Sequence, residues 1–206
     1  QFISGDSHMD RLLERVFASP GKGARPAFMD MVARRNGGSW DMVRESAVIV
    51  EAVHIASLLH DDVVDGSLMR RGVSTINARY SNKVSVLLGD YLFLKAIMLA
   101  QAADHPDIVG VIHQAVQRMI GGEVRDSLES VPADEAAYLT TIGDKTASLF
   151  AAAGELGIIL TGGGSRERAC GRNLGEAVGM AFQIIDDVLD WHGDSSAMGK
   201  PTFVDL

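Results

Sequence analysis

The sequence contains the same acidic motif, D-D-x-x-D, at residues 61–65 and again at residues 186–190. In a helix, residues four apart lie one above the other, about 6 Å along the axis, so the first and last aspartates of each copy share a face. Like charges at that spacing repel, and hard oxygen ligands favour Mg²⁺ over zinc. The motifs therefore predict Mg²⁺ binding, with five candidate ligands: Asp61, Asp62, Asp65, Asp186 and Asp190.

The alternative is that each acidic copy is only a solvated helix end. Basic residues argue against this, because Arg70 and Arg71 follow the first copy and Lys200 follows the second. Carboxylates, divalent cations and detached Lys or Arg residues together are typical of a diphosphate site, in which metal bridges protein carboxylates to phosphate oxygens. We therefore expect a diphosphate ligand.

The elements that must position these motifs have helical periodicity. Residues 84–103 are apolar on nearly every side, which is typical of the central helix of a bundle. Gly143 begins a predicted kink over residues 143–146, and no segment alternates as a strand would. The sequence predicts an all-α bundle, with helices over residues 10–17, 26–35, 41–65, 84–103, 106–129, from about 132 through the kink to 160, and 165–191.

Composition limits the kind of molecule. A chain of 206 residues predicts a single domain over residues 1–206, and 27 acidic against 19 basic side chains argue against binding nucleic acid or an anionic membrane surface. The single cysteine, Cys170, fits a reducing compartment, the cytoplasm. We expect no membrane-spanning segment, because no apolar run reaches ~18 residues. The chain starts without Met and stops just after Pro201, so we expect a fragment.

Further motifs are G-K-x-x-R-P at residues 21–26, E-x-x-H-x-A-S-L-L-H ahead of the first acidic motif, R-R-G at 70–72, G-D-Y-L at 89–92, K-T at 145–146, F-Q-I-I before the second acidic motif, and G-K-P at 199–201. Jointly they resemble the trans-isoprenyl diphosphate synthases, the polyprenyl synthetase family. The resemblance implies a helical bundle around a central cavity and C-terminal helices that are missing here. Gly23 and Ala24 depart from the basic and bulky pair that is usual there.

The resemblance implies a reaction. A Mg²⁺-dependent prenyltransferase ionises an allylic diphosphate, the double bond of isopentenyl diphosphate attacks the allyl cation, and a proton is lost. Residues that match catalytic or metal-binding positions are Asp61, Asp65, Asp186, Lys145 and Lys200. Those that match substrate contacts are Arg70, Thr146 and Gln183 for the allylic diphosphate, and Lys22, Arg25, His54 and Arg71 for isopentenyl diphosphate.

Two helical residues have plainer interpretations. His54 lies on a largely apolar helix, where a lone histidine is often a core residue with satisfied hydrogen bonds. Glu123 could orient a cationic group, or it could serve packing alone. Both are kept as candidates beside the motifs.

Product length is predicted from small residues before the first acidic motif. In the family, large aromatic side chains at the positions of Ala56 and Ser57 block a hydrocarbon tunnel and give short products. Small residues here would let the chain pass toward Val53, so we predict a polyprenyl diphosphate longer than C20. A floor on another helix, at Phe93, Met98 or Met119, would instead give a farnesyl or geranylgeranyl product.

Other functions remain possible from sequence. A non-catalytic subunit of a heteromeric prenyl synthase usually loses an acidic motif, whereas both copies are intact here. A class I terpene cyclase shares the all-α fold but carries a different second metal motif and lacks the basic residues for isopentenyl diphosphate. We also expect a homodimer, because residues 84–103 and 106–129 have more apolar surface than one small bundle can bury.

Overall fold

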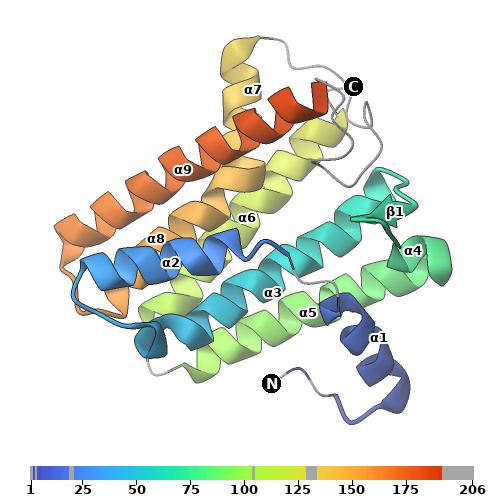
Figure 1. Cartoon of the computed structure of the whole chain (residues 1–206), viewed down its shortest axis with the longest axis horizontal. Helices are drawn as coiled ribbons and strands as arrows, with labels where there is room; N and C mark the ends of the chain where they lie inside the picture. The colour runs from blue at the N-terminus through green and yellow to red at the C-terminus, as the bar shows by residue number, and fades with distance from the viewer. Residues whose placement is uncertain (1, 3, 19–20, 104, 129–133, 192–206) are drawn as a thin grey trace.

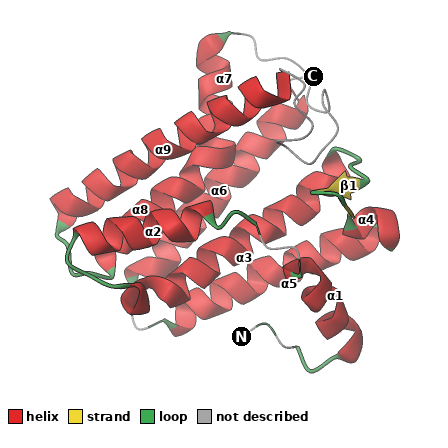
Figure 2. Cartoon of the chain, viewed as in Figure 1, coloured by secondary structure: helices red, strands yellow, loops and turns green. Residues whose placement is uncertain are grey.

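The computed structural model describes residues 2, 4–18, 21–103, 105–128 and 134–191, and helices account for most of them (Figure 1; Figure 2). The predicted all-α fold class is confirmed. The helices are α1 (Ser7–Phe17), α2 (Ala24–Arg35), α3 (Trp40–Val64), α4 (Ile76–Arg79), α5 (Asn82–Ala102), α6 (Asp107–Leu128), α7 (Glu135–Ile142), the π-helix η1 (Gly143–Ala147), α8 (Ser148–Ile159) and α9 (Ser165–Trp191).

Local sequence signals explain the helix ends. α1 begins three residues before its predicted start, because the Asp6 side chain accepts hydrogen bonds from the amides of His8 and Met9. Asp134 caps α7 in the same way, through the amide of Ala137. The predicted kink at residues 143–146 is confirmed as η1, which joins α7 to α8 without a break.

The centre of the bundle is α8. Eleven of its twelve residues are buried, and it contacts α2, α3, α6 and α9. Close approach depends on glycine: a methyl group at Gly154 would lie 2.2 Å from the backbone oxygen of Gly171 on α9. The short run of Ala and Gly in α8 lets neighbouring helices pack against it from several sides.

The prediction that residues 84–103 form the central helix is wrong. α5 packs along α3, but Leu87, Leu94 and Met98 are 55%, 56% and 49% exposed. The expectation that no segment reaches the length of a membrane span is also wrong, because α5 is long and apolar enough to cross a membrane by length and composition. Apolar helices packed inside helical bundles have the same length and composition, so these properties alone are weak evidence for a membrane span.

The prediction that the chain has no strands is wrong at one place. Strands β1 (Met69–Arg70) and β2 (Val73–Ser74) pair antiparallel, with Met69 opposite Ser74. The two residues between them, Arg71 and Gly72, have φ angles of 51° and 75°. Positive φ at both positions is the geometry of a tight two-residue hairpin, which Gly supports and Arg rarely adopts. The hairpin carries both arginines that follow the first acidic motif.

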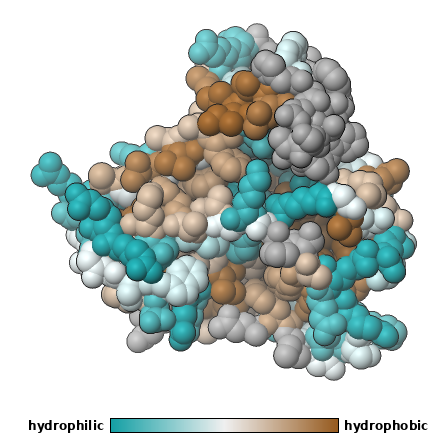
Figure 3. Space-filling model, viewed as in Figure 1, coloured by the Kyte–Doolittle hydropathy of each residue, from teal (hydrophilic) through white to brown (hydrophobic). Residues whose placement is uncertain are grey.

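Both acidic motifs lie at the same end of the bundle. Figure 1 shows the C-terminal ends of α3, α6 and α9 gathered on the side of β1. On the same face, Figure 3 shows apolar side chains around α7 and the C-terminal half of α9, where Ile185 and Val188 are 60% and 49% exposed. The fold thus brings together two segments that are more than a hundred residues apart in the sequence.

Candidate active site

The first acidic motif occupies the end of α3, and its aspartates differ in exposure. Asp62 is 4% exposed, whereas Asp61 is half-buried and Asp65 is exposed. The amide of Asp65 donates to the backbone oxygen of Asp61 at 2.8 Å, so the helical geometry continues to the end of the motif. Residues four apart share a helix face, which puts Asp61 and Asp65 together and Asp62 on another side.

Asp62 holds the hairpin against α3. Arg70 Nε donates to Asp62 Oδ1 at 2.8 Å, and Asn77 Nδ2 donates to the backbone oxygens of Asp62 and Ser67 at 2.9 and 3.0 Å. Burial raises the pKa of Asp62, and the charge of Arg70 opposes that rise. The side chain of Asp62 therefore orients Arg70 in this structure, and its role as a metal ligand stays a prediction.

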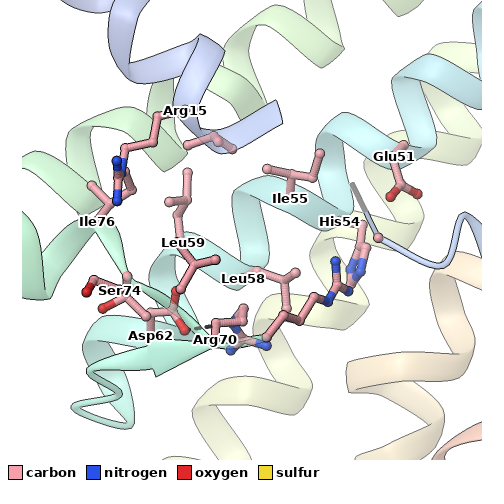
Figure 4. Close-up of a pocket in the computed structure, with 15 residues that line it drawn as sticks. Arg15, Glu51, His54, Ile55, Leu58, Leu59, Asp62, Arg70, Ser74 and Ile76 are labelled. Carbon is pink, nitrogen blue, oxygen red and sulfur yellow. Dashed lines mark hydrogen bonds and ion pairs between the residues drawn. The ribbon is translucent and has the colours of Figure 1, made fainter. Parts of the chain in front are cut away.

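Basic side chains gather farther up α3, between α2 and the hairpin. We call Arg25, Glu51, His54, Arg70 and Arg71 the cationic cluster. Figure 4 shows Glu51, His54 and Asp62 following one another along α3, with Arg70 facing Asp62. All but Arg25 line a cavity of about 110 Å³ that the hairpin partly covers. A methyl group at Gly21, in the loop before α2, would lie 3.2 Å from the Arg71 guanidinium and 3.3 Å from Glu51 Oε1.

Arg25 has the least favourable environment in the cationic cluster. It is 8% exposed, and its guanidinium carbon lies 4.8 Å from the centre of the Phe150 ring. Its Nε is buried and has no hydrogen-bond partner among the described residues. Burial lowers the pKa of Arg25 to about 10, although Glu51 opposes the change. A buried donor without an acceptor is costly, so this position is suited to an anionic ligand.

His54 is neutral in this environment. Burial lowers its pKa well below 6.5, and the positive charges of Arg25, Arg71 and Arg70 lower it further. Its ring lines the same cavity as Arg71, as expected for a ligand contact. The structure thus brings together three of the four residues predicted to bind isopentenyl diphosphate. The fourth, Lys22, is exposed in the loop next to Gly21.

Carboxylates surround the next candidate, Lys145 of η1. Its Nζ donates to Asp126 Oδ2 at 2.6 Å and lies 2.9 Å from Glu123 Oε2, both on α6. Of the two interpretations of Glu123, the contact with Lys145 favours the one in which it orients a cationic group. Asp61, on α3, interacts electrostatically with both Glu123 on α6 and Lys145 on η1. We call Asp61, Glu123, Asp126 and Lys145 the acidic cluster.

Charge balance in the acidic cluster shifts two pKa values. Burial lowers the pKa of Lys145, but the hydrogen bonds that it donates to Asp126 and Glu123 outweigh burial and raise the pKa, so the lysine stays charged. Burial raises the pKa of Asp61 to about 7, with a further rise from the negative charge of Glu123 and an opposing effect of Lys145. Three carboxylates around one ammonium leave an excess of negative charge, which a cation would relieve.

A chain of hydrogen bonds connects η1 to the second acidic motif. Thr146 Oγ1 donates to Gln183 Oε1 at 2.7 Å, and Gln183 Nε2 donates to Asp187 Oδ1 at 2.8 Å. The hydroxyl of Tyr138, on α7, donates to the other oxygen of Asp187 at 2.6 Å. Thr146 and Gln183 were predicted to contact the allylic diphosphate; the structure brings them into hydrogen-bond contact, and their role toward a ligand stays a prediction. Tyr138 and Asp187 were missed, and nothing in the spacing of Tyr138 indicates its partner.

Other candidates are placed with less detail. Asp186 is half-buried, and Asp190 is 7% exposed near the end of α9. Lys200, with its G-K-P motif, lies outside the described residues. Of the predicted tunnel residues, Val53 and Ala56 are fully buried and Ser57 is half-buried; none of them lines the 110 Å³ cavity or a wider one of about 780 Å³ beside α1. Of the predicted floor residues, Phe93 is half-buried, Met119 is 7% exposed and Met98 is 49% exposed.

The donor set fits a hard divalent cation, though not as a closed cage. Within the described ranges, no three His, Cys, Asp or Glu side chains are arranged to hold a metal by themselves. Mg²⁺ sites commonly use one or two carboxylates, several waters and the phosphate oxygens of a substrate. Oxygen donors at Asp61 and Asp65, together with the negative charge that raises the pKa of Asp61, suit such a shared site.

Comparison with known proteins gives a consistent answer. The polyprenyl synthetase family matches residues 6–206. Octaprenyl diphosphate synthase of Haemophilus influenzae is 38% identical over 188 residues, which cover 90% of this chain and 57% of that protein. Heptaprenyl diphosphate synthase component 2 of Geobacillus stearothermophilus is 36% identical over 190 residues, or 90% of this chain and 59% of that protein.

The fold matches a solved structure equally well. A crystal structure of polyprenyl synthase from Caulobacter crescentus CB15, complexed with calcium and isoprenyl diphosphate, superposes with a TM-score of 0.92 at 35% identity. The match covers 99% of this chain and 63% of that one. The chain therefore spans less than two thirds of the length of each of these relatives.

Proposed function

Because this chain belongs to the polyprenyl synthetase family, we propose that it forms the catalytic centre of a trans-prenyltransferase, which joins an allylic diphosphate to isopentenyl diphosphate. The observation that supports this most is the position of η1. Lys145 interacts electrostatically with Asp61 of the first acidic motif. The adjacent Thr146 donates a hydrogen bond to Gln183, which lies three residues before the second acidic motif. One turn of helix thus interacts with residues of, or next to, both motifs, which supports a shared site.

The acidic cluster would bind the allylic diphosphate. Asp61, Asp65 and Asp186 would hold Mg²⁺, with Asp62 and Asp190 assisting, and this ion would neutralise the charge that develops on the departing diphosphate. Lys145 stays charged, and two of the three donors of its ammonium suffice for Asp126 and Glu123, so the third can donate to an outer phosphate oxygen. Lys200 and Arg70 would supply further positive charge.

The cationic cluster would bind isopentenyl diphosphate, which must stay intact and therefore needs no metal. Arg25 and Arg71 present guanidinium groups, and neutral His54 can donate one hydrogen bond without adding charge. Lys22 would approach from the loop. With the double bond held near the ionised allylic carbon, a new carbon–carbon bond forms and the released pyrophosphate takes the proton.

We propose a product longer than C20. Ala56 and Ser57 lie one turn before Asp61 and are small, so the growing hydrocarbon can pass them toward Val53. Relatives named octaprenyl and heptaprenyl diphosphate synthases support this choice. A farnesyl or geranylgeranyl product is the alternative if Phe93 or Met119 closes the path.

Apolar surface supports an accompanying proposal of a homodimer through α5 and α6. Leu87, Leu94 and Met98 on α5, and Ile120 and Val124 on α6, are all about half exposed. Burying such a surface in a symmetric interface would stabilise the bundle. The single cysteine fits the cytoplasm as the compartment that we propose.

One incubation separates the possible functions. The product of the complete gene is mixed with Mg²⁺, labelled isopentenyl diphosphate and either geranyl or farnesyl diphosphate, and products are separated by chain length. Labelled products beyond C20 support the proposal, and labelled products of C20 or less show a short-chain synthase. A cyclic hydrocarbon shows a terpene cyclase, and inert protein shows a non-catalytic subunit. Heteromeric assembly is relevant because one relative is named as component 2 of its enzyme.

A further inference from the structure

The π-helix η1 is an uncommon element at the centre of the site. A π turn leaves backbone groups without their α-helical partners, and such turns are often associated with function. In η1 the residues that face the two acidic motifs, Lys145 and Thr146, are adjacent in sequence. What keeps the chain in this conformation therefore decides where Lys145 points.

Side chains donate to two carbonyl oxygens of η1. Arg118 of α6 donates from Nη2 to the backbone oxygen of Gly143 at 3.2 Å, and the same oxygen accepts from the amide of Ser148. Ser148 Oγ donates to the backbone oxygen of Asp144 at 2.6 Å. Each bond reaches an oxygen in the wider turn and so lowers the cost of the π geometry.

Arg118 also binds two carboxylates on different elements. Its Nε donates to Asp144 Oδ1 at 2.8 Å, and its Nη1 and Nη2 donate to the two oxygens of Glu176 on α9 at 3.0 and 2.7 Å. Arg125 adds a bond to the other oxygen of Asp144 at 3.2 Å. Two-point pairing of this kind fixes orientation as well as distance. Side-chain exposures of 35% for Arg118 and 23% for Asp144 give partial protection from water.

Close backbone packing completes the attachment. A methyl group at Gly122 of α6 would lie 2.6 Å from the amide nitrogen of Lys145. This glycine lets η1 lie directly against α6, one helical turn beyond Arg118. The position of η1 is thus defined on the α6 side by Gly122 and Arg118 and on the α9 side by Glu176 through the same guanidinium.

We infer that Arg118 is a positioning residue, which joins η1 to α6 and α9 and so sets the place where Lys145 meets the allylic diphosphate. This inference rests on the proposed function. Arg118 touches no reacting atom, so its loss would act through Lys145. The cationic cluster lies on α2, α3 and the hairpin, away from these bonds, and its ligand would be unaffected.

The test compares two ion pairs that both join α6 to α9. Arg118→Ala removes the pair with Glu176, and Arg168→Ala removes the pair with Asp107, near the other end of α6. Arg118→Lys keeps the charge but not the two-point geometry, and Glu176→Gln weakens only the α9 contact. Kinetics are measured for each substrate, and hydrogen exchange is measured at the amides of residues 143–148.

We expect Arg118→Ala to lower kcat/KM for the allylic diphosphate by about 10²-fold, the scale of a misplacement near 1 Å. The KM for isopentenyl diphosphate should stay within about twofold, Arg118→Lys should recover only part of the loss, and exchange at residues 143–148 should quicken. Arg168→Ala should change neither the kinetics nor that exchange. Equal losses in Arg118→Ala and Arg168→Ala, or equal effects on both substrates, would overturn the inference.

Failure of the proposed function gives a different result. If the wild-type protein forms no prenyl product, that function is wrong, and hydrogen exchange still decides the structural part of the inference. Faster exchange in Arg118→Ala alone then supports the attachment of η1 through Arg118, and unchanged exchange overturns it.

Discussion

The cationic cluster and the acidic cluster adjoin the same half of α3, yet their charge balance is opposite. In the cationic cluster, four basic or imidazole side chains accompany one carboxylate, Glu51, and Arg70 also pairs with Asp62 beside the cluster. In the acidic cluster, two carboxylates contact the ammonium of Lys145, and a third, that of Asp61, interacts with it electrostatically. Burial opposes the charged form in both places: it lowers the pKa of Arg25 to about 10 and raises the pKa of Asp61 to about 7.

The difference explains how an acidic protein could bind two diphosphates side by side. A diphosphate that must remain intact needs only cations, and the cationic cluster supplies them without metal. A diphosphate that must leave needs stronger charge stabilisation, and an excess of carboxylates is suited to recruit Mg²⁺ for it. In each cluster, charge that is unfavourable in the protein alone would become favourable with the proposed ligand bound.

The largest effect is expected in the acidic cluster. Asp61→Asn should reduce kcat by about 10³-fold or more, because the metal site loses a ligand whose charge the transition state needs. Without metal, the same change should raise Tm at pH 8 by about 2–4 °C, the shift that ~1 kcal/mol gives in a domain of this size. Ionised Asp61 lowers stability above its raised pKa of about 7, and asparagine removes that cost.

A matched control for Asp61→Asn is Asp41→Asn, which changes an exposed carboxylate at the start of the same helix. It should leave kcat unchanged and should not raise Tm, because an acidic side chain in the first turn stabilises a helix. Added Mg²⁺ should raise the Tm of the wild type more than that of Asp61→Asn. A variant that keeps its activity, or an equal response to Mg²⁺, would contradict the role assigned to the acidic cluster.

The next effect separates the two clusters. Arg25→Gln should raise the KM for isopentenyl diphosphate by about 10²-fold, because a buried charge-assisted contact is lost. The KM for the allylic diphosphate should change by less than about threefold. Steady-state kinetics with each substrate varied in turn measures both values.

Arg34→Gln, at an exposed position on the same helix, is the control for Arg25→Gln. It should leave both KM values unchanged. Equal increases for the two substrates in Arg25→Gln would show that the clusters do not bind separate diphosphates.

The third prediction tests whether the hydrocarbon of the product grows away from the acidic cluster along α3. Ala56→Phe should shorten the product, since a ring one turn below Asp61 would block an apolar path. Ala56 is fully buried, so overpacking could cost about 1–3 kcal/mol; Ser57→Phe, at a half-buried position, is the second variant. Chromatography of the products gives chain length, and an unchanged profile in a folded variant would refute the tunnel.

Sequence patterns predicted those helices and kinks that depend only on nearby residues in the chain. Apolar residues at helical spacing gave α3 and α9, and Gly143 marked the kink that the structure forms as η1. The hairpin was not predicted because Arg71 adopts a positive φ, which residues with a Cβ rarely do. The central position of α8 was not predicted either. It depends on small residues that let neighbouring helices approach closely, and the mean hydropathy of a segment does not measure that closeness.

Side-chain partners across helices could not be predicted from spacing. Arg118 and Glu176 are 58 residues apart, and Tyr138 and Asp187 are 49 apart. Their meeting depends on the rotation and offset of packed helices, which a single sequence does not specify. The acidic motifs were identified because repulsion between carboxylates four residues apart is visible within one helix.

The smallest effect concerns stability and sharpens the account of the cationic cluster. His54 is half-buried beside Arg25 and Arg71, and its pKa is lowered well below 6.5 by burial and by their positive charges. Below pH 6.5 the unfolded chain therefore binds a proton that the folded chain does not, so His54 lowers the free energy of unfolding as pH falls. His54→Gln should remove this contribution, which amounts to about 1 kcal/mol between pH 7.5 and 5.5.

Urea unfolding at pH 7.5 and pH 5.5 measures the contribution of His54. That contribution is the change in the free energy of unfolding between the two pH values in the wild type minus the same change in His54→Gln. His113→Gln, which alters an exposed histidine on α6, is the control and should leave the pH dependence as in the wild type. If His54→Gln and the wild type lose the same stability on acidification, His54 is not held neutral by its neighbours. The surplus of positive charge in the cationic cluster would then be smaller than its geometry indicates, and Arg25 alone would have to account for selectivity between the two diphosphates.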